Sequence, residues 1–220
     1  MKNKITAVIF DMDGVLIDTE PLNDLHMVKF LKKLGVTVDY DYLQKFRGVH
    51  AKYIWSHLIK EFNLTTPIDE LIANVRKSYI EYLLSLDKLE PIEGVIQFIE
   101  KLKKQKIKVA VASSAYHKRI NLLLEICKLK DFFDVIISGD HVQHAKPDPE
   151  IYIRAAQLLE RDPKNCIVFE DAINGILAAK AAGMKVIGYK GADHNKQDLS
   201  KADKIINSFK NITPSVLKGL

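Results

Sequence analysis

The sequence predicts an α/β fold, in which a three-layer, doubly wound parallel sheet of Rossmann-like type carries an inserted helical domain. Six short apolar runs rich in β-branched residues are typical of strands covered on both faces, and they span residues 5–10, 107–112, 135–138, 166–169, 186–189 and 204–206. From about residue 92 onward these runs alternate with helical stripes, which predicts right-handed crossovers and a parallel sheet. Between the first two runs lie roughly ninety residues without a convincing strand, far more than one crossover helix requires.

The helical stripes of the sheet domain follow the i, i+3, i+4, i+7 spacing of helices that are buried on one side. They are Val95/Phe98/Ile99/Leu102, Ile120/Leu123/Leu124/Cys127 and Tyr152/Ala155/Ala156/Leu159. Asp148 is expected to cap a helix that opens at Pro149, and Gly183 to end the alanine-rich helix after Asp171. Because parallel sheets collect functional groups at the carboxyl ends of their strands, we expect the important residues just after the apolar runs.

The long segment between the first two strands is expected to form a helical cap domain. Its predicted helices run from Pro21 to a stop at Gly35 and over residues 40–46, 51–62 and 68–86. The resulting division is a Rossmann-like catalytic core of residues 1–16 and 90–220 and a helical cap of residues 17–89.

Composition limits the classes of protein to which the chain can belong. Its 220 residues, 47% of them hydrophobic, are enough to bury a full core. No stretch approaches the roughly 20 apolar residues of a membrane span, and the first apolar run is too short for a secretory signal, so we expect a cytoplasmic protein without a membrane partner. The net charge of +5 comes from lysines spread along the chain, which predicts solvated helix faces and no nucleic-acid partner. We expect a monomer, with a dimer as the alternative.

Neither the cysteines nor the histidines indicate a zinc site. Cys127 and Cys166 have no CxxC or Cys/His spacing, so we expect buried free thiols. The histidines, including His144, show no metal-like spacing with acids on a shared face, and we interpret them as ordinary polar residues.

The sharpest local feature is a pair of acids, Asp11 and Asp13, that follows the first predicted strand and stands beside Gly14. Acids in such a buried place are unfavourable unless they are paired or bind a metal. An ordinary Asp-Gly turn is one alternative explanation. A calcium loop is another, but it needs further oxygen ligands and a glutamate at its twelfth position, whereas the acids here are followed by an apolar run. The pair therefore favours function over a plain turn.

Three later places add to this pair, and each lies just beyond a strand or at the start of a helix: Ser113-Ser114, Lys146-Pro147-Asp148 and Glu170-Asp171. Taken singly, each has an ordinary explanation as a helix cap or a solvated side chain. Together they comprise what phosphoryl transfer needs: a nucleophile, a proton shuttle, acidic ligands for a cation, a fixed positive charge and donors for phosphate oxygens.

These motifs, in this order, resemble those of the haloacid dehalogenase superfamily, specifically its β-phosphoglucomutase-like phosphatase branch of the subfamily I type, with a helical cap after the first strand. The residues that carry the resemblance are 11–16, 111–114, 146–147, 170–171, 174–175 and 181–184. The match spans nearly the whole chain. It implies a Mg²⁺-dependent hydrolase that forms an aspartyl-phosphate.

The resemblance also assigns roles in catalysis. Asp11 would attack phosphorus, and Asp13 would protonate the leaving alcohol and later deprotonate the hydrolytic water. Mg²⁺ and Lys146 would cancel charge, because a carboxylate is a poor nucleophile toward a phosphate dianion. The magnesium would be held by the Asp11 side chain, the Asp13 backbone carbonyl and Asp171, with Glu170 as a direct ligand or acting through water.

For phosphate and substrate binding, the resemblance implies two groups of residues. The Ser113 hydroxyl and the backbone amides of Ser114 and Ala115, at the start of a helix, would hold phosphate oxygens. In the cap, a loop containing Arg47, Gly48 and His50 would face the substrate, with exposed surface charge as the alternative reading of the two charged residues. The expected partner is a small phosphorylated metabolite, such as a sugar, polyol or nucleoside monophosphate.

Other activities of the superfamily would require different residues at some of these positions. Dehalogenases and the phosphonate-cleaving branch lack an acid at the place of Asp13, which argues against both. The alternative is a β-phosphoglucomutase that interconverts β-glucose 1-phosphate and glucose 6-phosphate. Mutases of this type carry a histidine where this chain has Asn23, and a cap lysine where a gapless count places Val75, with Arg76 adjacent. A non-catalytic module on this fold would be signalled by loss of Asp11 or Lys146, and both are present.

Overall fold

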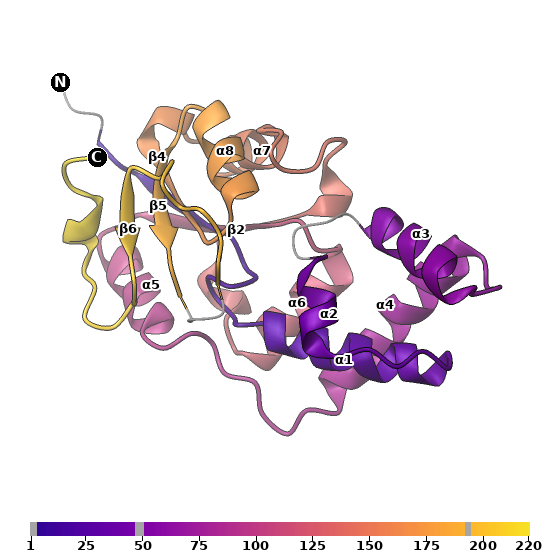
Figure 1. Cartoon of the computed structure of the whole chain (residues 1–220). Coiled ribbons are helices and arrows are strands. Elements are labelled where there is room, and N and C mark those ends of the chain that lie inside the picture. Colours follow the sequence, from indigo (N-terminus) through magenta and orange to yellow (C-terminus); the bar gives the residue numbers. More distant parts are fainter. Residues whose placement is uncertain (1–3, 47–50, 192–194) are drawn as a thin grey trace. The chain divides into compact units, whose positions relative to one another are not determined.

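The sheet at the centre of the fold is a six-stranded parallel sheet with the strand order β3-β2-β1-β4-β5-β6 (Figure 1). The structure, a computed structural model, describes residues 4–46, 51–191 and 195–220. The strands are β1 (Ala7–Phe10), β2 (Lys108–Ser113), β3 (Val135–Ser138), β4 (Cys166–Glu170), β5 (Lys185–Tyr189) and β6 (Lys204–Ile206). All six strands expected from the apolar runs are present, and the predicted doubly wound α/β fold is confirmed.

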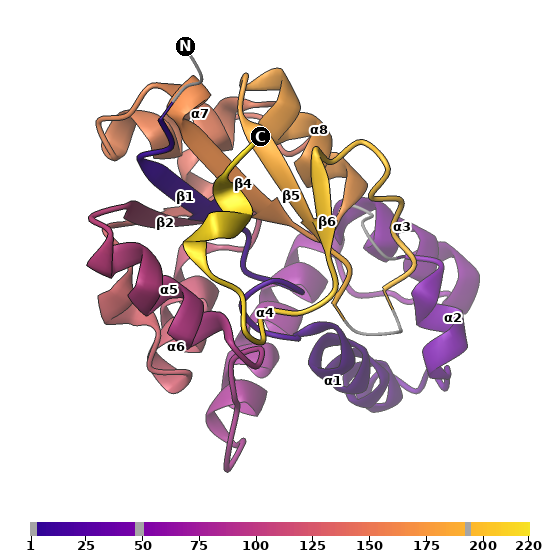
Figure 2. The same ribbon diagram turned by 90° about the vertical axis from the view of Figure 1, so that its left-hand side faces the viewer.

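Helices cover both faces of this sheet: α7 (Glu150–Leu158) and α8 (Ile173–Ala181) lie on one face, and α5 (Val95–Lys104) and α6 (His117–Ile126) on the other (Figure 2). Because side chains alternate along a strand, β1 contributes to both layers. Ala7 and Ile9 belong to the core beneath α7 and α8. Phe10 stacks on Phe169 and meets Phe98 of α5 edge to face. Burial on both faces is the reason why the strands are almost continuously apolar.

The start of α7 and the end of α8 can be compared with the predicted boundaries. Helix α7 begins at Glu150, one residue later than predicted, because Pro149 serves as its N-cap residue. Asp148 nevertheless accepts a hydrogen bond from the Glu150 amide, at 2.9 Å. Gly183 follows α8 with φ +76°, and the amides of Gly183 and Met184 donate to carbonyls in the last turn, so the predicted stop is confirmed.

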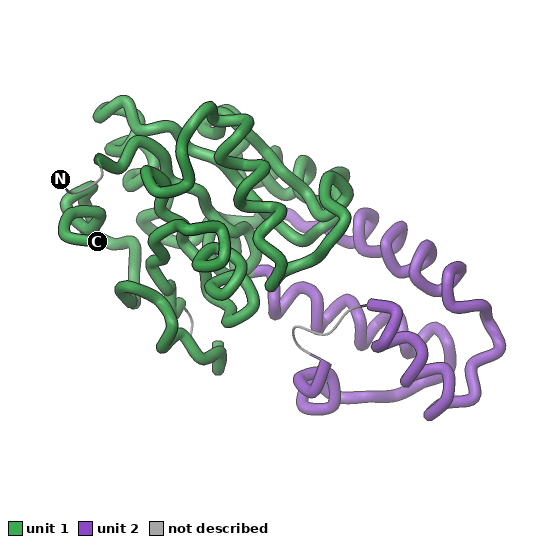
Figure 3. The backbone as a smooth tube through the Cα atoms, turned by 90° about the horizontal axis from the view of Figure 1, so that it is seen from above, with its two compact units in different colours: residues 1–18, 88–220 green, residues 19–87 purple. Residues whose placement is uncertain are grey.

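The chain divides into two compact units, drawn in different colours in Figure 3. Unit 1 comprises Met1–Asp18 and Lys88–Leu220 and contains the sheet; unit 2 is Thr19–Asp87. The sequence-based boundaries lie two residues away, at 17 and 89. That unit 2 acts as a cap stays a prediction at this point.

Unit 2 has a helical core of its own. Its helices are α1 (Glu20–Lys33), α2 (Tyr40–Gln44), α3 (Ala51–Phe62) and α4 (Ile68–Leu84). They pack around apolar side chains that include Leu31, Trp55 and Leu58, each nearly inaccessible to solvent. α2 and α4 each end two residues before the predicted limits of 46 and 86. The four predicted helices are therefore present, and their limits differ from the predicted ones by at most two residues.

Two further expectations concern the cysteines and the membrane. Cys127 and Cys166 are buried free thiols, as predicted. Within the described part of the chain, none of the helices combines the length and the apolar character needed to cross a bilayer.

Candidate active site

Acidic and hydroxyl side chains meet at the carboxyl edge of the sheet in unit 1. Asp11 directly follows β1, Ser113 is the last residue of β2, and Glu170 is the last residue of β4. Phe10 of β1 is in register with Val111 and with Phe169, so these strand ends lie side by side. Parallel pairing around the central strand therefore brings together residues separated by about 160 positions, as the fold predicted.

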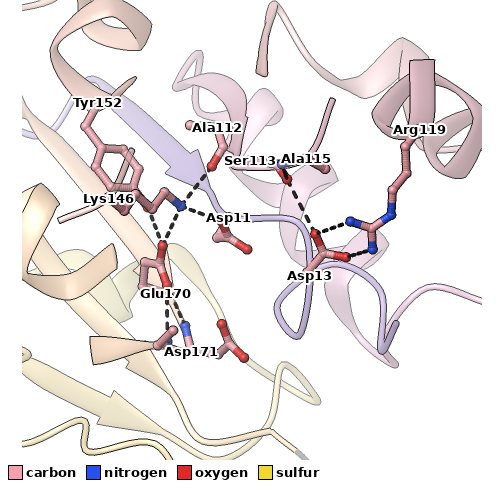
Figure 4. Close-up of polar contacts among 11 residues, drawn as sticks. Asp11, Asp13, Ala112, Ser113, Ala115, Arg119, Lys146, Tyr152, Glu170 and Asp171 are labelled. Atoms are coloured by element: carbon pink, nitrogen blue, oxygen red, sulfur yellow. Dashed lines mark hydrogen bonds and ion pairs between the residues drawn. The ribbon is translucent and has the colours of Figure 1, made fainter. Parts of the chain in front are cut away.

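Lys146 is the centre of the buried polar contacts (Figure 4). Its Nζ donates to Asp11 Oδ1 at 2.5 Å, to Glu170 Oε1 at 2.7 Å and to the Ala112 carbonyl at 3.2 Å. Burial alone would lower the pKa of this ammonium, but the carboxylates of Asp11 and Glu170 outweigh burial and hold its pKa well above the usual value. Lys146 is thus a fixed positive charge beside Asp11.

Both carboxylate oxygens of Glu170 already have partners. Oε1 accepts from Lys146 and from the Tyr152 hydroxyl, at 2.6 Å, while Oε2 accepts from the backbone amides of Asp171 and Ala172, at 3.1 and 3.2 Å. Gly175 leaves room for this side chain, because a Cβ there would lie 1.7 Å from Glu170 Oε1. We predicted Tyr152 only as a core residue of a helical stripe, and its hydroxyl contact was missed.

Asp11 and Asp171 are acids in unfavourable surroundings. Burial, with the negative charges of Glu170 and Asp13, raises the pKa of Asp11 to about 7, although Lys146 opposes the shift. The pKa of Asp171 is also raised well above its usual value, by burial and then by Glu170, Asp11 and Asp13. The cluster is therefore short of positive charge.

The excess of buried acidic groups is relevant to whether the site is suited to a magnesium ion. Carboxylate and carbonyl oxygens are the donors that Mg²⁺ prefers, and a cation would relieve the repulsion that raises both pKa values. The loop after β1 lies close against Asp171: Gly14 has φ +77°, and a Cβ there would lie 2.1 Å from Asp171 Oδ2. In chemical type, the oxygen donors of Asp11, the Asp13 carbonyl and Asp171 are those that Mg²⁺ takes, and the metal site itself stays a prediction.

Asp13 has different surroundings from Asp11. Arg119 of α6 donates Nη2 to Asp13 Oδ1 at 2.6 Å and Nη1 to Oδ2 at 3.3 Å, and the Ser113 hydroxyl lies 3.5 Å from Oδ2. Arg119 was missed by the sequence reasoning. One signal was available, since Arg119 is four residues before Leu123 and so belongs to the inner face of α6.

The turn after β2 differs from the expectation for phosphate binding. Helix α6 begins at His117, with Tyr116 extended at ψ 151°, so the amides of Ser114 and Ala115 are not at the start of the helix and that placement was wrong. The Ala115 amide donates to Ser113 Oγ at 3.1 Å instead. Gly139 closes on this turn, because a Cβ there would lie 2.5 Å from the Ser114 carbonyl oxygen. The roles of these three residues stay predictions.

The remaining predicted residues divide into two cases. Arg47, Gly48 and His50 lie outside the described residues. The prediction that the histidines show no metal-like spacing with acids on a shared face was wrong for His144, because its ring nitrogen lies within 4.8 Å of carboxylate oxygens of Asp148 and Glu150. Local contacts account for this group: Glu150 Oε2 accepts from the backbone amides of Gln143 and His144 and pairs with the His144 ring at 3.3 Å.

Known proteins resemble this chain along nearly all of its length. A sequence model described as haloacid dehalogenase-like hydrolase matches residues 8–189. The chain is 32% identical to a phosphorylated carbohydrates phosphatase of Thermotoga maritima, over 94% of this chain and 99% of that one. It is 30% identical to the validoxylamine A 7'-phosphate phosphatase of Streptomyces hygroscopicus subsp. limoneus, over 92% and 93%. The solved structure of a putative β-phosphoglucomutase from Thermotoga maritima superposes with a TM-score of 0.81 at 30% identity, covering 98% of this chain and all of that one.

Proposed function

The chain belongs to the haloacid dehalogenase-like hydrolase family, and on that premise we propose that it hydrolyses small phosphomonoesters with Mg²⁺ through an aspartyl-phosphate. Its phosphatase relatives make it a hydrolase of phosphoric monoesters. The metal, the covalent intermediate, the residue roles and the substrate class are what we add to that assignment.

The observation that carries the proposal is that two neighbouring acids have separate cationic partners. Asp11 is buried and bonded to Lys146 at 2.5 Å, and Asp13 is held by Arg119 from another direction. Two carboxyl groups in different environments are able to take different roles, one as nucleophile and one as proton carrier. The fixed charge of Lys146 favours attack on an anionic phosphate, because it offsets repulsion between the phosphate and Asp11.

In the proposed reaction, a carboxylate oxygen of Asp11 attacks phosphorus, the bond from phosphorus to the ester oxygen breaks, and that oxygen takes the proton of Asp13. Water then attacks phosphorus and gives its proton to Asp13, the bond to Asp11 breaks, and inorganic phosphate leaves. Mg²⁺, when bound by Asp11, the Asp13 carbonyl and Asp171, supplies positive charge beside the phosphoryl oxygens. Ser113 and the Ser114 and Ala115 amides are proposed to bind those oxygens.

Glu170 is proposed to act mainly through Lys146. Its two oxygens accept four hydrogen bonds from protein donors, which favours contact with the metal through water over direct ligation. Its negative charge helps to keep Lys146 protonated. In this role Glu170 orients the ammonium toward Asp11.

We propose sugar, polyol or nucleoside monophosphates as substrates and unit 2 as the cap that selects among them. Two relatives support this class, since one is a phosphatase of phosphorylated carbohydrates and the other a phosphatase of validoxylamine A 7'-phosphate. Mutase activity is less well supported. Asn23 stands in α1 in place of the mutase histidine, and Val75 packs against the apolar core of unit 2 instead of offering a cation.

A panel of phosphomonoesters assayed for phosphate release, with Mg²⁺ and with a chelator, tests the proposal. We expect release from at least one sugar or polyol phosphate and from 4-nitrophenyl phosphate, and its loss with the chelator. Asp11→Asn should lower turnover by more than a thousandfold, because it removes the nucleophile. Wild-type rates in this variant would contradict the mechanism. Conversion of β-glucose 1-phosphate to glucose 6-phosphate without release of phosphate would instead identify a mutase.

A further inference from the structure

The guanidinium of Arg119 holds the carboxylate of Asp13 by two parallel contacts. Nη2 lies 2.6 Å from Oδ1, and Nη1 lies 3.3 Å from Oδ2 (Figure 4). The Arg119 side chain is 14% exposed and that of Asp13 28% exposed, so the pair is largely withdrawn from water. In such surroundings a two-pronged contact is considerably stronger than an exposed ion pair.

The backbone of α6 makes the position of Arg119 well defined. Ile120, Leu123 and Leu124 of the same helix are completely buried in unit 1 and anchor the helix on which the arginine stands. Asp13 belongs to the turn after β1, where its neighbour Met12 is also completely buried. Both partners of the contact are therefore carried by backbone segments that packing holds in place.

The acids of the site divide between two cations. Lys146 donates to Asp11 and Glu170, and two guanidinium nitrogens of Arg119 donate to Asp13. The separation corresponds to the two roles in the proposed reaction, because Lys146 serves the acid that attacks and Arg119 serves the acid that moves protons.

We propose that Arg119 is a positioning residue for Asp13. Its two contacts hold the ionised carboxylate that takes the proton of water in the second step, and in the first step, when one oxygen carries the proton for the ester oxygen, the guanidinium holds the carboxyl group by the other oxygen. This inference rests on the proposed function. It adds a residue to the machinery that none of the expected motifs contains.

The physical reason lies in the geometry of proton transfer. A carboxyl group turns freely about two side-chain bonds, whereas it must present one oxygen within hydrogen-bond reach of the ester oxygen. A planar guanidinium that contacts both oxygens restricts these rotations, and a lysine, with a single point of contact, does so less well. Small displacements of a catalytic group lower the rate by a large factor.

The dependence of the rate on the leaving group isolates this role. 4-Nitrophenolate departs without protonation, while an alkoxide needs a proton from Asp13. In Arg119→Ala we expect kcat/KM for glycerol 1-phosphate to fall at least tenfold more than kcat/KM for 4-nitrophenyl phosphate, with KM nearly constant. Because both substrates are assayed on one preparation, the ratio does not depend on how much of the variant is folded.

Three further variants serve as controls for the ratio between the two substrates. Lys118→Ala removes a neighbouring exposed positive charge and should leave the ratio unchanged. Arg119→Lys should restore part of it. In an Asp13→Asn background, Arg119→Ala should cause no further change in the ratio, since the two residues act as one unit.

Equal losses for the two substrates in Arg119→Ala would overturn the inference, as would a rise in KM at constant kcat, which indicates that Arg119 binds substrate. Failure of the underlying function is recognised separately. If Asp11→Asn retains wild-type activity, the proposed function is wrong; if Asp11→Asn is inactive while the ratio in Arg119→Ala is unchanged, only the role of Arg119 is wrong.

Discussion

At the scale of single residues, the buried ammonium of Lys146 is stable only because its surroundings supply negative charge on two sides. Asp11 and Glu170 both contact it, and Glu170 is in turn held by Tyr152 and two backbone amides. Such a network is strong when every member has a partner and costly when one is removed.

Tyr152→Phe tests this network without changing shape. The substitution removes one donor to Glu170 Oε1, and the hydrogen bond it breaks is to a buried carboxylate. We expect the free energy of unfolding to fall by about 1–3 kcal/mol, measured by urea denaturation. Tyr42→Phe is the matched control, because the Tyr42 hydroxyl also donates to a glutamate, Glu61, which is exposed. A loss in the control as large as that in Tyr152→Phe would show that burial is not the cause.

At the scale of secondary-structure elements, Asp203 connects three parts of unit 1. It precedes β6, accepts from the Val186 amide of β5 at 2.8 Å, and pairs with Lys180 of α8 and Lys185 of β5 at 2.7 and 3.0 Å. Partial burial tends to raise the pKa of this carboxyl, but the hydrogen bonds and the positive charges outweigh burial and lower its pKa to about 2. A short edge strand with one buried side chain is thus attached through a carboxylate.

Asp203→Asn should therefore destabilise the protein in a pH-dependent way. The folded pKa of about 2 lies below the ordinary aspartate value of 3.8, so the stabilisation is complete above about pH 4 and is lost as the pH falls toward 2. We expect a loss of about 2 kcal/mol in unfolding free energy at pH 7 and a smaller difference between variant and wild type below pH 4. Urea unfolding at several pH values measures it. A difference that stays constant across this range would exclude the ionised carboxyl as the cause.

At the scale of the whole molecule, the two units have separate cores, and the acids of the candidate magnesium site all belong to unit 1. Asp11, Asp13, Glu170 and Asp171 lie close together without a metal ion, and burial together with their mutual repulsion raises the pKa values of Asp11 and Asp171. Binding of a cation should consequently stabilise this unit.

Addition of Mg²⁺ is expected to raise the thermal unfolding midpoint by several degrees, since a ligand at 100 times its Kd contributes about 2.7 kcal/mol. Asp171→Asn should abolish this shift without lowering the midpoint in the absence of metal, because it removes an unfavourable buried charge. Differential scanning calorimetry measures both effects. Asp203→Asn is the control: it should start from a lower midpoint and keep the Mg²⁺ shift. Retention of the full shift in Asp171→Asn would remove Asp171 from the metal site.

The sequence alone determined the fold class, the six strands, the four helices of the inserted unit and the order of the motifs. These features depend on local periodicity and on residue types at strand ends, which are written directly in the chain. The family was also recognisable from the sequence, because each of its motifs is a short contiguous segment, and the match of the family model confirms it.

The resemblance predicted that Lys146 contacts Asp11, which is confirmed, whereas only the tertiary structure decided the partners of Asp13 and Tyr152. Arg119 and Asp13 are 106 positions apart in the sequence. Tyr152 in α7 and Glu170 at the end of β4 are 18 positions apart. Helical periodicity places Arg119 on the inner face of α6, but it does not identify Asp13 as the partner. The start of α6 at His117 was likewise settled by the turn that packs against Gly139. Long-range packing, which local sequence does not encode, thus determines the partners of the acids in the candidate site.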